Sequence, residues 1–243
     1  RSVYEGMRNG QIYKTAQITP QVFAHHFSRY AENGDQAIYI GFSSELSSTF
    51  QSAVMARQYL KESYPDFDLE IIDTKAASGG VGLIVYETAK AAKNGASKEN
   101  LLKILEFYIN NCNQIFTVDD IEYLYRGGRV SKTSAILGGM LNIKPILEVN
   151  NGKLVLIEKV RGRAKVFKRM LELVEERNID KDFSKRTFVI AHGDDLEGAE
   201  KLRNMIEEKF GVKNFLVIAV GAVIGAHSGP GTLCVFYSSK NMS

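Results

Sequence analysis

GAVIGAHSGPG, at residues 221–231, is the stretch on which the interpretation of this chain depends. It sets one histidine, His227, among four glycines and a proline, and apolar runs at 215–220 and 233–236 flank it. Glycine allows positive φ and lets another backbone or a ligand come close. We therefore predict a strand, a segment of irregular backbone and a second strand. His227 is then either a packed core histidine or a binding residue.

The segments before this stretch predict an α+β second half. Asn150-Asn151-Gly152 separates two β-rich runs, 144–149 and 153–160, and predicts a hairpin. Asp194, with Glu197 three residues on, predicts the start of a helix that ends near residue 210. The other predicted elements are helices at 119–126, 131–140 and 164–177 and strands at 187–191, 215–220 and 233–237. A hairpin, a βαβ unit and a closing strand make an α+β pattern.

The first half alternates strands and helices, which predicts a parallel α/β sheet with ligands at the carboxyl ends of its strands. A helix from Pro20 to about Glu32 has Phe23, Phe27 and Tyr30 as one buried stripe. The other predicted elements are strands at 36–42, 69–72 and 114–118 and helices that end near Tyr64, Asn94 and Tyr108.

The composition is that of a globular protein and narrows the classes of partner. The chain has 243 residues and a formal net charge of +3, with lysines and arginines dispersed, which argues against nucleic acid as the main partner. Cys112 and Cys234 are expected to be buried thiols in a reducing compartment. No apolar run approaches the roughly 20 residues that span a bilayer. We expect a cytoplasmic protein without stable membrane insertion.

The motifs of several common chemistries are missing from the sequence. No HExxH motif or cysteine pair indicates a metal, no P-loop indicates nucleotide hydrolysis, and SGGVG (78–82) does not fit G-x-G-x-x-G. His25, His26 and His192 are expected to be surface or structural residues. The remaining candidate groups are the hydroxyls of Thr15, Ser47, Ser48 and Thr49, together with His227. Such neutral donors suit an acidic head group in a partly buried site, although the serines could instead cap the next helix.

Seven segments form a joint pattern in a fixed order along nearly the whole chain. They are TAQITP (15–20), SSELSSTFQSA (43–53), DT with SGGVG (73–82), DDIEYLYRGGRVS (119–131), LNIKPIL (141–147), KVRGRAK (159–165) and GAVIGAHSGPG (221–231). Together they resemble the DegV family of bacterial fatty-acid-binding proteins, which are the binding subunits of fatty acid kinase. The match departs from the family pattern at Ala16, Ile18 and Ser48, where a hydroxyl residue, a proline and a glycine are usual.

The resemblance implies a two-domain, DegV-like α/β fold. Residues 1–113 would form a parallel α/β domain, apparently without its first strand, and residues 114–243 an α+β domain. A long-chain fatty acid would lie in an apolar tunnel between them. The protein would present its carboxylate to a kinase catalytic subunit, which makes an acyl phosphate for phospholipid synthesis. The chain itself would be a lipid-binding subunit without cofactor or catalytic residue.

The resemblance also implies roles for single residues. By position, Thr15 and Ser47 would bind the carboxylate, Ser48 would add its backbone N–H, and His227 would complete the network from the other domain. Arginines of the RGGR and VRGR motifs would dock the kinase. These arginines are Arg126, Arg129, Arg161 and Arg163.

The residues themselves are also compatible with two other functions, an enzyme and an interaction module. Ser47 could be a nucleophile with His227 as its base on a small ester or phosphate, and Asp73 or Asp119 could orient the histidine. An interaction module without a ligand is expected if side chains fill the tunnel. A lipid carried by the purified protein would favour the fatty-acid carrier, whereas covalent labelling of Ser47 would favour the enzyme.

Overall fold

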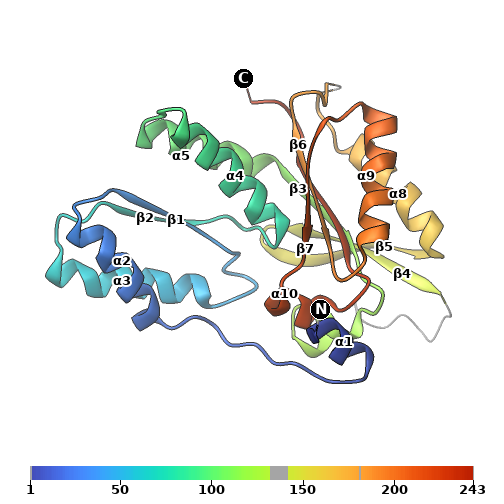
Figure 1. Cartoon of the computed structure of the whole chain (residues 1–243), viewed down its shortest axis with the longest axis horizontal. Helices are drawn as coiled ribbons and strands as arrows, with labels where there is room; N and C mark the ends of the chain where they lie inside the picture. The colour runs from blue at the N-terminus through green and yellow to red at the C-terminus, as the bar shows by residue number, and fades with distance from the viewer. Residues whose placement is uncertain (1, 132–141, 181, 243) are drawn as a thin grey trace.

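The computed structural model describes residues 2–131, 142–180 and 182–242, which form two sheets and the helices that cover them (Figure 1). The strands are β1 (Ala37–Gly41), β2 (Leu69–Asp73), β3 (Cys112–Thr117), β4 (Ile143–Asn150), β5 (Lys153–Arg161), β6 (Thr187–His192), β7 (Asn214–Ala219) and β8 (Leu233–Ser238). The helices are α1 (Ser2–Arg8), α2 (Pro20–Glu32), α3 (Thr49–Ser63), α4 (Gly79–Lys93), α5 (Lys98–Asn111), α6 (Glu122–Arg126), α8 (Arg163–Glu176), α9 (Leu196–Phe210) and α10 (Ala222–Ser228). This mixed architecture confirms the predicted α/β class.

The smaller sheet pairs β1 with β2 in parallel and has helices on both faces (Figure 1). On one face, Phe23 and Phe27 of α2 pack with Tyr39 of β1 and the apolar side of α3. On the other face, Ile84 of α4 belongs to a cluster with α5 and the opposite side chains of the strands. Tyr30, predicted to join the stripe of α2, is 51% exposed, because the cluster around Phe23 and Phe27 does not reach the last turn of the helix.

The larger sheet has the strand order β5-β4-β3-β8-β6-β7. Helices α8 and α9 cover one of its faces (Figure 1). The predicted core face of α8 is confirmed, since Val166, Phe167 and Met170 are buried in one cluster with strand residues such as Phe188. The predicted hairpin is the β4–β5 turn, where Asn151 and Gly152 take positive φ.

Helix α4 lies between the two sheets (Figure 1). A Cβ added to Gly79 would lie 2.7 Å from the Phe236 ring of β8, and one added to Gly80 would overlap Gln114 of β3. The glycines of the SGGVG segment therefore allow the first turn of α4 to approach the larger sheet. This close packing accounts for Gly79 and Gly80.

Three predicted details are wrong or shifted. The strand predicted at 114–118 is β3, which pairs antiparallel with β4 and β8 and does not extend the parallel sheet of the first half. The reason is that α5 follows α4 directly, so the chain leaves the small sheet before β3. Asp195, not Asp194, caps α9 by accepting from the Gly198 N–H, because Asp194 takes positive φ. Helix α6 begins at Glu122 and not at residue 119.

The described helices and strands do not test two of the predictions, which are the domain boundary and one helix. The domain boundary at 113/114 stays a prediction, with β3 beginning at Cys112. The helix predicted at 131–140 falls almost wholly outside the described residues. Across the described ranges, no helix is both long and apolar enough to cross a bilayer.

Candidate functional site

A cavity of about 590 Å³ lies between loops of the small-sheet half and the larger sheet. Residues 15–18, 46–49 and 77–78 line it from one side, and β3, the β4–β5 hairpin, β8 and α10 line it from the other. Its wall is mainly apolar, with Leu46, Phe116, Val149, Leu154, Val220 and Phe236 among the lining side chains. The volume falls within the 300–1,000 Å³ that is typical of small-molecule sites. Side chains do not fill this space.

The stretch at 221–231 contains a short helix, α10, which corrects the prediction of irregular backbone. Gly221 precedes the helix and Gly229, at φ 79°, ends it. Tyr4 of α1 packs against α10 and donates a hydrogen bond to the Val220 carbonyl at 2.8 Å. A Cβ at Gly225 would lie 2.5 Å from the Tyr4 hydroxyl, so glycine permits this approach. The helix places His227 in its last turn, in the wall of the cavity.

His227 meets Thr15 across the cavity wall. Its Nε2 lies 2.7 Å from Thr15 Oγ1, a hydrogen bond between residues 212 positions apart. Gly127 lies beside the other ring nitrogen, because a Cβ added there would come closer than 3.0 Å to Nδ1. Burial, and then the positive charge of Arg129, hold the pKa of His227 below its usual value. The imidazole is therefore neutral at neutral pH.

The hydroxyl loop after β1 lines the same cavity. Ser47 Oγ donates to Thr49 Oγ1 at 3.0 Å and accepts from the Thr49 N–H at 3.2 Å. Ser48 is the N-cap of α3, and its side chain makes no capping bond. The structure thus brings Thr15, Ser47, Ser48 and His227 to one cavity. Their roles in binding stay predictions.

The four arginines predicted to dock a partner differ in their surroundings. Arg126 and Arg161 are exposed, and Arg126 pairs with Glu122 on its own helix at 3.2 Å. Arg163 is half-buried and forms ion pairs with Asp119 and Asp195. Two of the four therefore face solvent, whereas Arg163 is tied to neighbouring elements.

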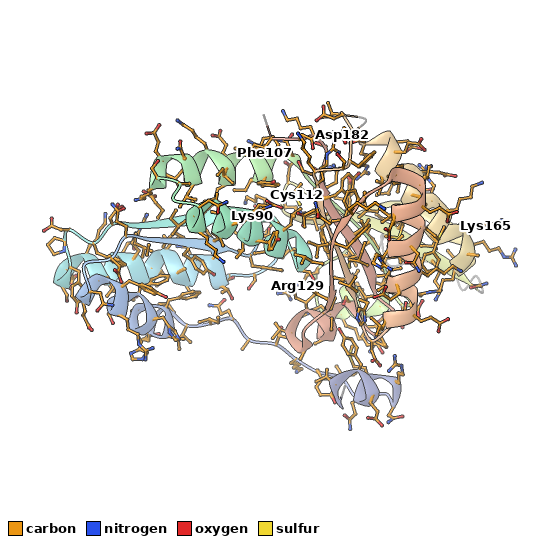
Figure 2. The ribbon with its side chains drawn as sticks, turned by 45° about the horizontal axis from the view of Figure 1, so that its top comes forward. Lys90, Phe107, Cys112, Arg129, Lys165 and Asp182 are labelled. Carbon is orange, nitrogen blue, oxygen red and sulfur yellow. The ribbon has the colours of Figure 1, made fainter. Side chains whose placement is uncertain are left out.

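Arg129 lines the cavity, a position that sequence reasoning missed. Its Nε and Nη2 donate to the Leu46 carbonyl at 3.0 and 2.9 Å, and its Nη1 donates to the Gly127 carbonyl. Figure 2 shows Arg129 at the centre of the molecule, between the small-sheet half and the larger sheet. One feature of the sequence could have indicated this position. Arg129 directly follows Gly127 and Gly128, the two glycines that end α6, and the chain changes direction there.

The remaining candidates for chemistry have structural surroundings. His25 and His26 are exposed on α2, and His192 Nδ1 accepts from the Asp195 N–H at 3.1 Å. Cys234 lines the cavity, but burial raises its pKa to about 12, so the thiol stays protonated. No group of His, Cys, Asp and Glu side chains in the described part of the chain is arranged to hold a metal ion.

Comparisons with known proteins agree on one family. A family model described as "Uncharacterised protein, DegV family" matches residues 1–240. A DegV domain-containing protein of Clostridium perfringens is 41% identical over 238 residues, which are 98% of this chain and 81% of that protein.

Solved structures show the same likeness. A DegV lipid-binding protein of Thermotoga maritima superposes with a TM-score of 0.86 at 30% identity, over 98% of this chain and 81% of that one. A fatty-acid-binding DegV family protein of Thermus thermophilus gives a TM-score of 0.87 at 30% identity, over 98% and 84%. The whole described fold is therefore shared with proteins of that family.

Proposed function

Because the chain belongs to the DegV family, we propose that it binds a long-chain fatty acid, with the carboxylate at the Thr15–His227 pair. The observation that carries the proposal is an apolar cavity with this polar pair in its wall. Two solved relatives are lipid-binding or fatty-acid-binding proteins, which supports it. Burying about fifteen methylenes gains on the order of 12 kcal/mol before the costs of association. The acyl chain would therefore supply most of the affinity and the polar pair would set the orientation.

The polar end of the cavity suits a carboxylate held by neutral donors. When His227 Nε2 carries the hydrogen, it donates to Thr15 Oγ1, and the Thr15 hydroxyl is then free to donate to the ligand. Ser47 and the backbone N–H of Ser48 would add donors near the start of α3. Neutral donors hold the carboxylate without a tight ion pair that would shield it from a second reactant.

Lipid analysis of the purified protein tests the proposal. Native mass spectrometry should show a bound species, and mass spectrometry of the denatured sample should identify it as a fatty acid. Thr15→Ala and Ser47→Ala should each weaken rebinding of palmitate to the delipidated protein, with unchanged circular dichroism. An empty protein without saturable palmitate uptake would overturn the proposal.

We further propose that the chain presents the bound carboxylate to a fatty acid kinase, which converts it to an acyl phosphate. Arg126 and Arg161 are exposed and suit docking to an acidic partner surface. Arg129 and Arg163 already contact the Leu46 carbonyl and Asp119, and they would bind a partner only while sharing these contacts with it. Acyl-phosphate formation with the kinase subunit tests this step. Arg126→Ala should lower turnover without changing palmitate affinity, and unchanged turnover would count against the docking role.

The second candidate, a serine hydrolase, receives little support from the contacts. Ser47 Oγ bonds to Thr49, and His227 bonds to Thr15, so the predicted nucleophile and base are not paired. Asp73 interacts with Ser44 and Lys75, and its carboxylate does not orient the histidine among the described contacts. Covalent labelling of Ser47 by a serine-directed phosphonate would reverse this assessment.

A further inference from the structure

Ser228, the last residue of α10, carries a buried hydroxyl that has no hydrogen-bond partner. The residue is 4% exposed, and its Oγ is one of two buried side-chain polar atoms that lack a partner in the described part of the chain. The other atom, Arg57 Nε, lies outside the described lining of the cavity, whereas Ser228 belongs to that lining. A buried hydroxyl is unfavourable until it is paired. Ser228 is therefore an unused binding group in the wall of the cavity.

The hydroxyl of Ser228 interrupts an apolar part of this wall. Ile224 lies one turn earlier on the same side of α10 and packs against the cluster that contains Phe116 and Cys234. These three residues also line the cavity. A buried water typically makes about three hydrogen bonds to protein groups, and this apolar neighbourhood offers few partners. The hydroxyl of Ser228 is therefore better paired by a polar group of the ligand than by a trapped water.

Thr232 contributes a second buried hydroxyl to the same lining. It is 1% exposed, and its Oγ1 donates to the carbonyls of Ser228 and Gly229 at 2.9 and 2.7 Å. A threonine hydroxyl has one hydrogen and two lone pairs, so this oxygen can still accept a hydrogen bond but has no further hydrogen to donate. The hydroxyl of Ser228 can donate or accept. A ligand hydroxyl, which also does both, complements the two side chains better than a carboxylate, which only accepts.

We propose that the cavity accepts fatty acids with a hydroxyl close to the carboxyl group, such as 3-hydroxy acids, and that Ser228 recognises this hydroxyl. This inference rests on the proposed function and deepens it, because it names a class of substrate. Consecutive Cα atoms are about 3.8 Å apart, so Ser228 lies close to the Thr15–His227 pair that is proposed to hold the carboxylate. The side of α10 that Ser228 shares with Ile224 faces the apolar wall, which suits contact with the acyl chain.

The two enantiomers of 3-hydroxypalmitate test the proposal, because they are equally hydrophobic and differ only in the direction of the hydroxyl. Isothermal titration of the delipidated protein at pH 8, where the carboxylates are ionised, gives a dissociation constant for each enantiomer and for palmitate. Ser228→Ala removes the hydroxyl. Ser228→Thr and Ser228→Val have the same shape and differ in the hydroxyl alone. Ser238→Ala is the matched control, because Ser238 is also 4% exposed but lies outside the described cavity lining.

We expect the wild type to bind one enantiomer about three- to tenfold more tightly than the other. Ser228→Ala and Ser228→Val should bring the two enantiomers within about twofold, whereas Ser228→Thr and Ser238→Ala should keep the preference. The affinity of Ser228→Ala for palmitate should stay within about twofold of the wild type, because palmitate offers Ser228 no hydroxyl.

Equal affinities of the wild type for the two enantiomers, or a preference that persists in Ser228→Ala and Ser228→Val, would overturn the inference. Weakening of palmitate in Ser228→Ala by as much as the preferred enantiomer would also overturn it, because Ser228 would then bind the carboxylate. A wild type that binds palmitate but neither hydroxy acid would overturn this inference alone, whereas one that binds none of the three would overturn the proposed function with it. Circular dichroism verifies folding, and Ser228→Thr against Ser228→Val decides the question if Ser228→Ala does not fold.

Discussion

Replacing Gly127 by alanine should break the contact between His227 and Thr15. Gly127 has φ −73° and ψ −11°, values that alanine adopts freely, so the backbone itself is not strained. The new Cβ would come closer than 3.0 Å to His227 Nδ1, whereas ordinary contacts begin at 3.4 Å. The ring must therefore retreat by more than about 0.4 Å. Because Nδ1 and Nε2 lie on opposite sides of the ring, the push is directed toward Thr15.

His227 cannot move closer to Thr15 to relieve this overlap. Its length is already 2.7 Å, so the imidazole must turn or the segment that carries Thr15 must move. Overpacking of this kind costs about 1–3 kcal/mol, and loss of the hydrogen bond about 0.5–1.5 kcal/mol. We expect the free energy of unfolding to fall by about 1–3 kcal/mol and the dissociation constant for palmitate to rise about two- to tenfold.

Urea unfolding and isothermal titration with palmitate measure the two effects. Gly82→Ala on α4 is the control, because a Cβ at Gly82 meets no atom within 4 Å and should leave binding unchanged and stability equal or slightly higher. If Gly127→Ala binds palmitate and unfolds like Gly82→Ala, the close approach of Gly127 to His227 is refuted.

Three further results are expected. Thr15→Val removes the hydroxyl at constant shape and should weaken palmitate binding about five- to tenfold in titration calorimetry; equal affinity would argue against a ligand role for Thr15. Ser43→Ala removes the buried hydrogen bond to the Gly152 carbonyl at 2.8 Å and should lower the free energy of unfolding by about 1 kcal/mol in urea, so an unchanged midpoint would show that the bond contributes nothing. Because the pKa of His227 is lowered on folding, the unfolded chain binds its proton at a higher pH than the folded chain does, and stability should decrease as the pH falls from the ordinary value of 6.5 toward the folded pKa. Thermal unfolding at several pH values should show a flatter acid side for His227→Gln than for the wild type, and parallel curves would contradict the assignment.

The elements that the sequence predicts well are those with a strong local signal. The apolar period of α8 and the Asn-Gly turn of the β4–β5 hairpin are each contained in one short segment, and both are confirmed. Helix α10 carries no such signal, since it has seven residues and is rich in glycine. Its packing against Tyr4, more than two hundred positions away, is information that no local pattern holds. Local sequence patterns also do not predict the sheet to which β3 belongs, because β3 pairs with β4 and β8, which lie far from it in the chain.

The candidate site shows the same division. The residues alone mark Thr15, Ser47 and His227 as candidate donors for an acidic head group, and the family resemblance is what assigns a role to each of them. Their meeting at one cavity depends on the tertiary fold. The inward direction of Arg129 was missed because an arginine that follows two glycines equally suits an exposed loop, and only its bonds to the Leu46 carbonyl reveal the difference.

The hydrogen bond between Thr15 and His227 has a consequence for the folding of the protein during its synthesis. It joins residues separated by 212 positions, so a nascent chain that has already exposed Thr15 must extend almost to the end of this sequence before the histidine emerges. Closing so long a loop is entropically unfavourable until the intervening strands and helices have folded. The proposed lipid site would therefore be complete only after His227 has left the ribosome, and chains that stop before this residue would lack the contact.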